Sequence, residues 1–347
     1  MKLRVFEAFA GYGSQSIALR NLGVDYEVVA ISEIDKYALQ AYYSLHDINI
    51  PNLGDITKLK IEDIPQHDLF TYSFPCQDIS VAGKREGIEK GKTRSGLLYE
   101  CERIIESCKP KYLLLENVKN LVGKKFKAQF DKWLEYLKSL GYTNYWQVLN
   151  AKDYGVPQNR ERVFVISILG EHKPYEFPEK IKLDKCIGDI LEDNVDDKYY
   201  MDKPFHFVNK GHQAELDMKG HDCIKRAYGI DNISPTLTAM QGGNTQPKIV
   251  CERRYDEGLR FFKGNVCGTI RTIDSGGDKR VIETESNFRI RKLTPRECFR
   301  LMGMNDKDID KIQASGISNS QQYKMAGNSI VINVLEEIFK NLFDINN

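Results

Sequence analysis

The sequence lacks any apolar run that approaches the roughly 20 residues of a membrane-spanning helix. Its first apolar stretch contains an acid, Glu7, which is typical of a buried strand and not of a secretory signal. The 347 residues are 41% hydrophobic and 29% charged, an ordinary balance for a globular protein with a substantial core. We therefore expect a cytoplasmic protein of about two domains with no membrane partner.

Cysteine pairs at metal-binding spacing are also lacking. Eight cysteines occur, but no two stand at the Cys-x-x-Cys spacing of zinc sites and redox dithiols. We expect no metal, and most cysteines should be small buried hydrophobic residues. The formal net charge of +1 does not indicate nucleic-acid binding. Residues 248–300 nevertheless contain 13 Lys and Arg against 8 Asp and Glu, which suits a polyanion, although such clusters are usually solvated surface.

The first 170 residues alternate apolar runs with helical patterns. The runs predict strands at residues 3–9, 27–32, 68–72, 112–115 and 163–169. The patterns between them predict helices at residues 16–22, 36–45, 97–107 and 126–140. This alternation indicates an α/β fold with a largely parallel sheet covered on both faces. Ligands of such sheets bind at the carboxyl ends of the strands.

A second region begins near residue 173. Prolines and an acidic run indicate a linker, and residues 203–288 are short, polar, Gly-rich segments without a long helical period. They predict a second, smaller, irregular β-rich domain. The helical pattern returns after Arg291 and ends in an apolar-striped helix at residues 329–343, which could pack on the first domain. We assign residues 1–172 plus 305–347 to one domain and residues 173–304 to the other.

Polar groups and glycines follow successive strands of the first domain. Phe9, Gly11 and Gly13 stand where the first strand turns into the first helix, and glycines let the backbone approach a ligand closely. Glu33 follows the second strand, where an acid can hold ribose hydroxyls. Asp55 ends the next segment and could accept an adenine amino hydrogen. Together they predict an adenosine site, although the glycines alone could form a tight turn and each acid could cap a helix.

Cys76 follows Pro75 directly after the third predicted strand, at the edge where ligands bind. The segment after it is rich in glycine and basic residues, including Lys84 and Arg85, and could fold over an anionic substrate. A buried structural cysteine is the alternative interpretation.

Further along the sheet, Glu116 ends a hydrophobic strand. Arg160 and Arg162 stand at positions i and i+2, on the same side of the last strand. A solvated edge would explain the two arginines equally well.

Six short segments occur in one order along the chain. They are Phe-x-Gly-x-Gly, Pro-Cys-Gln, Glu-Asn-Val, Gln-x-Arg-x-Arg, Leu-Thr-Pro-Arg and Gly-Asn-Ser. Each tripeptide alone is common, but the ordered set is specific. The sequence resembles the cytosine-5 DNA methyltransferase family, of the bacterial or phage restriction-modification type, over essentially the whole chain except residues 173–288.

The resemblance implies a Rossmann-like S-adenosylmethionine-dependent methyltransferase sheet and transfer of a methyl group from S-adenosyl-L-methionine to carbon 5 of a cytosine flipped out of a specific duplex DNA sequence. It makes Cys76 the nucleophile that adds to carbon 6 and Glu116 the acid at ring nitrogen 3. Arg160 and Arg162 would hold the carbonyl oxygen of the base and a flanking phosphate or the carboxylate.

The resemblance also implies which residues bind the cofactor. They are Phe9, Gly11, Gly13, Glu33, Ile34, Asp55, Ile56, Pro75, Leu97, Asn328 and Ser329. Ile34 departs from the family pattern, because many members carry an aromatic there to stack on adenine. A branched aliphatic side chain can still pack against that face.

By position, residues 173–304 correspond to the target-recognition domain of the family, and the remaining residues to its catalytic and cofactor-binding domain. The candidate DNA-binding residues are Ser80, Lys84, Arg85, Thr236, Leu237, Thr269, Ile270 and Arg271. Their hydroxyl, methyl and guanidinium groups could read base edges, although threonine–aliphatic pairs are also ordinary in strands. The sequence does not specify which bases are read.

The expected partner is double-stranded DNA, and we expect a monomer. A cognate restriction endonuclease could exist without forming a stable complex. Two alternatives stay open: a tRNA cytosine-5 methyltransferase of the same family, and a non-catalytic DNA-binding homologue. The long segment of residues 173–288 argues for a reader of duplex DNA, and the intact Cys76 and Glu116 argue against a non-catalytic protein.

Overall fold

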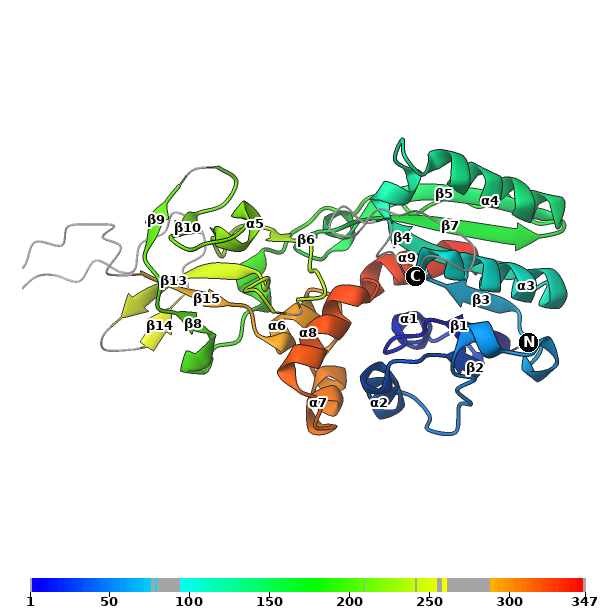
Figure 1. Ribbon diagram of the computed structural model, residues 1–347, viewed down its shortest axis with the longest axis horizontal. Helices are drawn as coiled ribbons and strands as arrows, with labels where there is room; N and C mark the ends of the chain where they lie inside the picture. Colours follow the sequence, from blue (N-terminus) through cyan, green and yellow to red (C-terminus); the bar gives the residue numbers. More distant parts are fainter. Residues whose placement is uncertain are drawn as a thin grey trace, which may run out of the picture.

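The computed structural model describes residues 2–75, 79, 94–208, 210–240, 242–254, 258–260 and 288–345. Two main sheets lie toward opposite ends of the long axis, and helices α6, α7 and α8 lie between them (Figure 1). These helices comprise Pro295–Arg300, Asp306–Ala314 and Asn319–Asn328. No helix within the described part of the chain is long and apolar enough to cross a membrane.

The first sheet has six strands in the order β2-β1-β3-β4-β7-β5. They comprise β1 Leu3–Ala8, β2 Tyr26–Ser32, β3 Leu69–Tyr72, β4 Tyr112–Val118, β5 Tyr142–Asn150 and β7 Glu161–Leu169. The first four strands in sequence are parallel, whereas β7 is antiparallel to β4 and to β5. The predicted α/β sheet is confirmed, but β5 was missed. Its sequence mixes polar and aromatic residues because it is a partly exposed edge strand.

Helices cover both faces of this sheet, as expected. They comprise α1 Ser14–Asn21, α2 Lys36–Leu45, α3 Leu98–Cys108, α4 Lys127–Ser139 and α9 Ile332–Leu342. Alternate residues of β1 point to opposite faces. Val5 packs in the core cluster that includes α1 and α9, and Phe6 packs in the cluster that includes α3 and α4. The predicted elements agree with these bounds to within three residues at each end.

The second sheet is mixed and consists of seven strands, most of them short. Its path is β8-β15-β13-β11-β10-β9, and β14 pairs with β13. The strands comprise β8 Tyr200–Met201, β9 Phe205–Phe207, β10 Ala214–Leu216, β11 Arg226–Tyr228, β13 Lys248–Arg254, β14 Gly258–Arg260 and β15 Phe288–Lys292. A short helix, α5, spans Asp222–Lys225. This is the β-rich region that the sequence predicts, and the short strands explain why no period could be found in it.

Single helical turns join many of these elements. They comprise η1 Ile56–Lys58, η2 Ile61–Asp63, η3 Arg94–Leu97, η4 Lys119–Val122, η5 Ala151–Tyr154, η6 Ile187–Ile190 and η7 Asp197–Tyr199. A two-stranded parallel pair joins β6, Gln158–Asn159, to β12, Ser234–Pro235. This pair connects the segment just before β7 to the second region.

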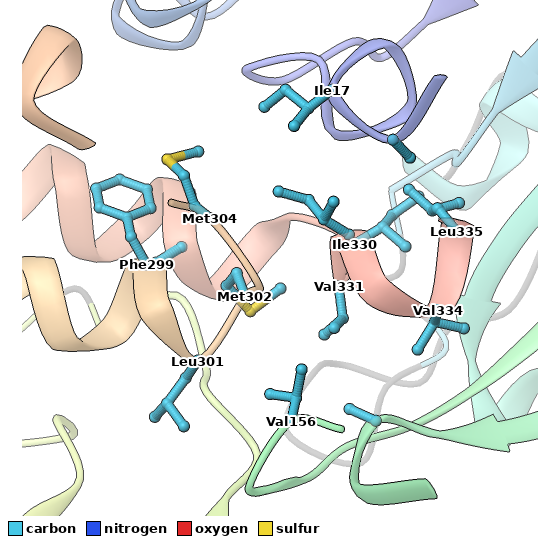
Figure 2. Close-up of a cluster of buried hydrophobic side chains, with 14 of the residues drawn as sticks. Ile17, Val156, Phe299, Leu301, Met302, Met304, Ile330, Val331, Val334 and Leu335 are labelled. Carbon is cyan, nitrogen blue, oxygen red and sulfur yellow. The ribbon is translucent and has the colours of Figure 1, made fainter. Parts of the chain in front are cut away.

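The C-terminal segments pack back onto the first helix. Figure 2 shows Phe299, Met302 and Met304 in one buried cluster with Ile17 of α1 and Ile330, which lies two residues before α9. The backbone N–H of Ile332 also donates to the carbonyl of Met302. The division into residues 1–172 plus 305–347 and residues 173–304 stays a prediction. The end of α6 and the residues after it, which that division gave to the second domain, share the core of the first.

Candidate active site

The turn after β1 has backbone conformations that favour glycine. Gly11 and Gly13 have φ values of 59° and 81°, and Phe9 has the unusual value of 55°. A Cβ on Gly13 would lie 2.5 Å from Nε2 of His46, so that position also has no room for a side chain. A Cβ on Gly11 would meet no described atom within 4 Å. The turn therefore packs against the side chain of His46 at Gly13 and leaves open space at Gly11.

Glu33 is fixed beside this turn by three backbone N–H groups. Its Oε2 accepts from Gly11 at 2.9 Å, and its Oε1 accepts from Ile34 at 2.8 Å and from Asp35 at 2.7 Å. Burial raises the pKa of this carboxyl, and the three hydrogen bonds oppose the rise. The carboxylate is thus held at the carboxyl end of β2 with lone pairs left for a ligand.

The neighbouring candidates differ in what they present. Ile34 is 76% exposed, an unusual surface for a large aliphatic side chain, whereas Ile56 is buried. The carboxylate of Asp55 accepts from the backbone N–H of Thr57 at 3.0 Å and from its hydroxyl at 2.8 Å. These bonds lower the pKa of Asp55. Asp55 therefore acts as a helix cap here, and its contact with adenine stays a prediction.

The C-terminal part of the chain contacts the segment after β2 through an ion pair. Lys324 of α8 pairs with Asp35, which also caps the start of α2. Asn328, at the end of α8, is exposed, and the Ser329 hydroxyl donates to the Met325 carbonyl at 2.8 Å. The ion pair brings the helix that carries the distant Asn328 and Ser329 to the turn that carries Glu33 and Ile34.

These features fit an adenosyl cofactor. The open position above Gly11, the fixed carboxylate of Glu33 and the exposed Ile34 supply a close backbone, an acceptor for hydroxyls and an apolar face. Within the described residues, no group of three His, Cys, Asp or Glu side chains is arranged to hold a metal. Pro75 and Leu97 are half-buried, and their contact with a cofactor stays a prediction.

Cys76 lies outside the described residues, but the chain on either side of it is anchored. The Asn117 side chain donates to the carbonyl of Phe74 at 3.0 Å, and the Asn120 side chain donates to the carbonyl of Ile79. Asn117 lies near the end of strand β4, and Asn120 lies in η4, the helical turn that follows it. No role was predicted for either asparagine, although Asn117 belongs to the Glu-Asn-Val segment. They fix the two ends of the segment that carries the cysteine.

Glu116 and Arg162 form a nearly buried ion pair on neighbouring antiparallel strands. Nε of Arg162 lies 3.1 Å from Oε1 of Glu116, and the two side chains are 15% and 10% exposed. The pairing of β4 with β7 sets Val118 opposite Arg162, which lets the guanidinium reach back to Glu116. Burial raises the pKa of Glu116, and the charges of Arg162 and Arg160 oppose the rise.

Arg160 occupies a different environment from Arg162. It is 3% exposed, and its guanidinium donates to three backbone carbonyls: Leu237 at 2.9 Å, Gly327 at 2.9 Å and Ser329 at 2.8 Å. The prediction that both arginines hold the substrate directly therefore has geometric support only for Arg162. The short β6 pair before β7 explains the difference, because it directs Arg160 toward the junction with residues 234–237.

Comparison with known proteins identifies the group to which this chain belongs. A sequence model described as C-5 cytosine-specific DNA methylase matches residues 3–344. The chain belongs to this family. It is 40% identical to the type II methyltransferase M2.ScrFI of Lactococcus lactis subsp. cremoris, over 98% of this chain and 99% of that protein. It is 36% identical to the orphan methyltransferase M.SPBetaI of Bacillus phage SPbeta, over 98% and 97%.

Solved structures agree on the fold. An Entamoeba histolytica methyltransferase, EhMeth, has a TM-score of 0.71 at 20% identity and covers 99% of this chain and 98% of its own. The Dnmt2 methyltransferase of S. pombe has a TM-score of 0.69 at 18% identity, over 99% of each chain. The predicted family and fold class are confirmed. The chain is a DNA cytosine methyltransferase of this family, which implies a methyl donor of the S-adenosylmethionine type.

In this methylase the DNA-binding candidates are only partly described. Ser80, Lys84, Arg85, Thr269, Ile270 and Arg271 lie outside the described residues. The hydroxyl of Thr236 donates to the carbonyl of Asn159 at 2.6 Å. Leu237 is 1% exposed, and both of its peptide groups are bonded inside the protein. The buried side chain of Leu237 gives no support to its predicted contact with a base edge, which stays a prediction.

Proposed function

We propose that this methylase transfers a methyl group from S-adenosyl-L-methionine to carbon 5 of a cytosine that is flipped out of a specific duplex DNA sequence, through a covalent adduct with Cys76. The observation that carries the proposal is the nearly buried pair of Glu116 on β4 and Arg162 on β7, close to Asn117 and Asn120, which anchor the two flanks of Cys76. A base placed between the cysteine and this pair would meet a nucleophile and a hydrogen-bonding acid together.

Carbon 5 of cytosine is a weak nucleophile until the ring is activated. The Cys76 thiolate would form a bond to carbon 6, and the ring electrons would then move toward carbon 5. Protonated Glu116 would donate a hydrogen bond to ring nitrogen 3, and the burial that raises its pKa favours this form. Arg162 would hold the base carbonyl oxygen. Once carbon 5 has taken the methyl group that the cofactor would supply, a base or water would remove the carbon 5 proton, the electrons would return to the ring, and the bond from sulfur to carbon 6 would break.

The cofactor, when bound, supplies an electrophilic methyl group. Glu33 would accept hydrogen bonds from the ribose hydroxyls, and Ile34 would pack against adenine. Gly11 would allow the backbone to approach the cofactor closely. Asn328 and Ser329 would complete the site from α8. Phe9, Gly13, Asp55, Ile56, Pro75 and Leu97 stay in the proposed set by resemblance.

The DNA would lie between the two regions of the molecule. Flipping costs a few kcal/mol of pairing and stacking, which contacts in the pocket offset. Thr236 stays a proposed DNA-contacting residue, together with Ser80, Lys84, Arg85, Thr269, Ile270 and Arg271. We further propose that the enzyme acts as a cytoplasmic monomer, beside a cognate endonuclease if one exists.

Two steps test the proposal. Bisulfite sequencing of DNA from an expressing host gives the modified sequence, and labelled methyl donor offered with plasmid DNA or total tRNA identifies the nucleic acid. A duplex with 5-fluorocytosine at the modified position should then trap a denaturant-resistant conjugate. Cys76→Ser should give no conjugate while it still binds S-adenosylhomocysteine. Turnover by Cys76→Ser, or label only in tRNA, would contradict the proposal.

A further inference from the structure

The backbone of helix α8 approaches the backbone of the second region closely at Gly327. A Cβ on Gly327 would lie 1.7 Å from the carbonyl oxygen of Thr238 and 2.4 Å from its carbonyl carbon. The φ of Gly327 is not positive, so the helix itself does not require glycine there. The requirement is one of space, because two backbones meet with no side chain between them.

Arg160 ties the same two segments together. One terminal nitrogen donates to the carbonyl of Leu237, and the other donates to the carbonyls of Gly327 and Ser329. Gln158 also fixes residue 237, because its Oε1 accepts from the N–H of Leu237 at 3.1 Å while its Nε2 donates to the carbonyl of Leu301, just after α6, at 2.7 Å. Charge-assisted bonds to buried carbonyls are among the stronger hydrogen bonds in proteins.

The two joined segments belong to different parts of the proposed site. Thr236, a proposed DNA contact, lies two residues before Thr238. Asn328 and Ser329, proposed cofactor contacts, follow Gly327 directly. We infer that Gly327 and Arg160 are positioning residues, which hold the DNA-facing residues 236–238 and the cofactor-facing end of α8 in one arrangement and so couple the binding of cofactor and DNA. This inference rests on the proposed function.

The contact transmits displacement in both directions. If bound DNA favours one position of residues 236–238, the backbone contact at Gly327 and the hydrogen bonds of Arg160 favour one position of Ser329 as well. Coupling between two ligands is reciprocal, so bound cofactor must favour DNA by the same factor. Typical coupling factors are roughly 5 to 150.

Gly327→Ala tests the contact, and Gly188→Ala is its matched control. The Cβ of the first would overlap the backbone of Thr238, whereas the nearest atom to that of the second, the carbonyl oxygen of Ile230, would be 3.5 Å away, an ordinary contact. Calorimetry would give the dissociation constant of S-adenosylhomocysteine alone and with a saturating duplex that the wild type methylates. Thermal unfolding would verify that each variant is folded.

We expect the duplex to tighten binding about tenfold in the wild type and in Gly188→Ala, within the usual range of coupling. In Gly327→Ala the factor should fall to about 1, while binding without DNA changes less than about twofold. Arg160→Lys, which keeps the charge but offers fewer fixed donors, should give an intermediate factor. If Gly327→Ala does not fold, Arg160→Lys decides.

If Gly327→Ala and Arg160→Lys both kept the coupling factor of the wild type, the inference would be overturned. So would an equal loss of affinity with and without DNA, because a purely local role at the cofactor predicts it. A wild type that methylates DNA but shows no coupling would refute the inference alone. A wild type that methylates no DNA would refute the proposed function instead.

Discussion

Two carboxyl groups are buried in the same sheet, and their surroundings distinguish two regions of the molecule. Glu7 of β1 is 0% exposed, and its oxygens accept from the N–H and hydroxyl of Ser16 and from the hydroxyl of Tyr42. Glu116 of β4 is also buried, and it pairs with the guanidinium of Arg162. The first acid has neutral partners, and the second has a charged one.

The difference shows that burial of an acid does not by itself mark a catalytic group. The three groups that donate to Glu7 belong to α1 and α2, so their hydrogen bonds join these helices to the sheet. Burial raises its pKa to about 7. Glu116 lies instead on the strand whose end anchors the Cys76 segment, with an arginine that can serve a substrate as well. We interpret Glu7 as structural and propose Glu116 as catalytic.

The largest expected effect is on the rate of methylation by Glu116→Gln. An amide cannot act as the proposed acid at ring nitrogen 3, so the rate should fall about 10²- to 10⁴-fold. The midpoint of thermal unfolding should change little. Glu7→Gln, the same change at the other acid, should keep a rate within a few-fold of wild type. If the two variants lost rate equally, the comparison would be wrong.

Glu7→Ala should affect stability more than the reaction. It removes the acceptor of three donors, the N–H and hydroxyl of Ser16 and the hydroxyl of Tyr42, and leaves a cavity. We expect the free energy of unfolding to fall by about 4 kcal/mol, as measured in urea. A loss below about 1 kcal/mol would mean that these donors find other partners.

The pH dependence of stability provides a third test of the role of Glu7. Its pKa is raised from 4.5 to about 7 in the folded protein, so the folded state binds the proton more tightly than the unfolded state. That contribution is complete below pH 4.5 and is lost as the pH rises through 7, a change of about 3 kcal/mol. Glu7→Gln should lack this loss in urea titrations from pH 4.5 to 8. If Glu7→Gln and the wild type lost stability over this pH range in the same way, the assignment would be contradicted.

The smallest expected effect is on the stability contributed by His46, whose ring lies against Gly13. Its Nε2 donates to the carbonyl of Tyr12 at 3.1 Å, and burial lowers its pKa to about 4. Here the folded state disfavours the proton, so this contribution to stability is present above pH 6.5 and is lost as the pH falls through 4. His46→Gln should cost about 1 kcal/mol at pH 7.5 and remove the loss at acid pH. A steeper acid loss in that variant would refute this role.

Local pattern was enough to predict the strands and helices of the first region, because periodicity reports which side chains face a core. It missed β5, whose partly exposed edge position gives no clear period, and it could not resolve the short strands of the second region. At the site, sequence order alone brought Glu33, Glu116 and Arg162 to the same edge of the sheet. It gave no signal for Asn120, because a side chain that bonds to a distant backbone carbonyl leaves no pattern in its own neighbourhood.

The sequence by itself determined the family, the α/β class and the chemical types at the site, because these depend on which residues occur and in what order. Only the tertiary structure decided that Arg160 serves backbone carbonyls while Arg162 faces an acid, that Leu237 is core, and that Gly327 must lack a side chain. Those outcomes depend on contacts between residues as many as 169 positions apart along the chain. Such contacts exist only after the two regions have packed together.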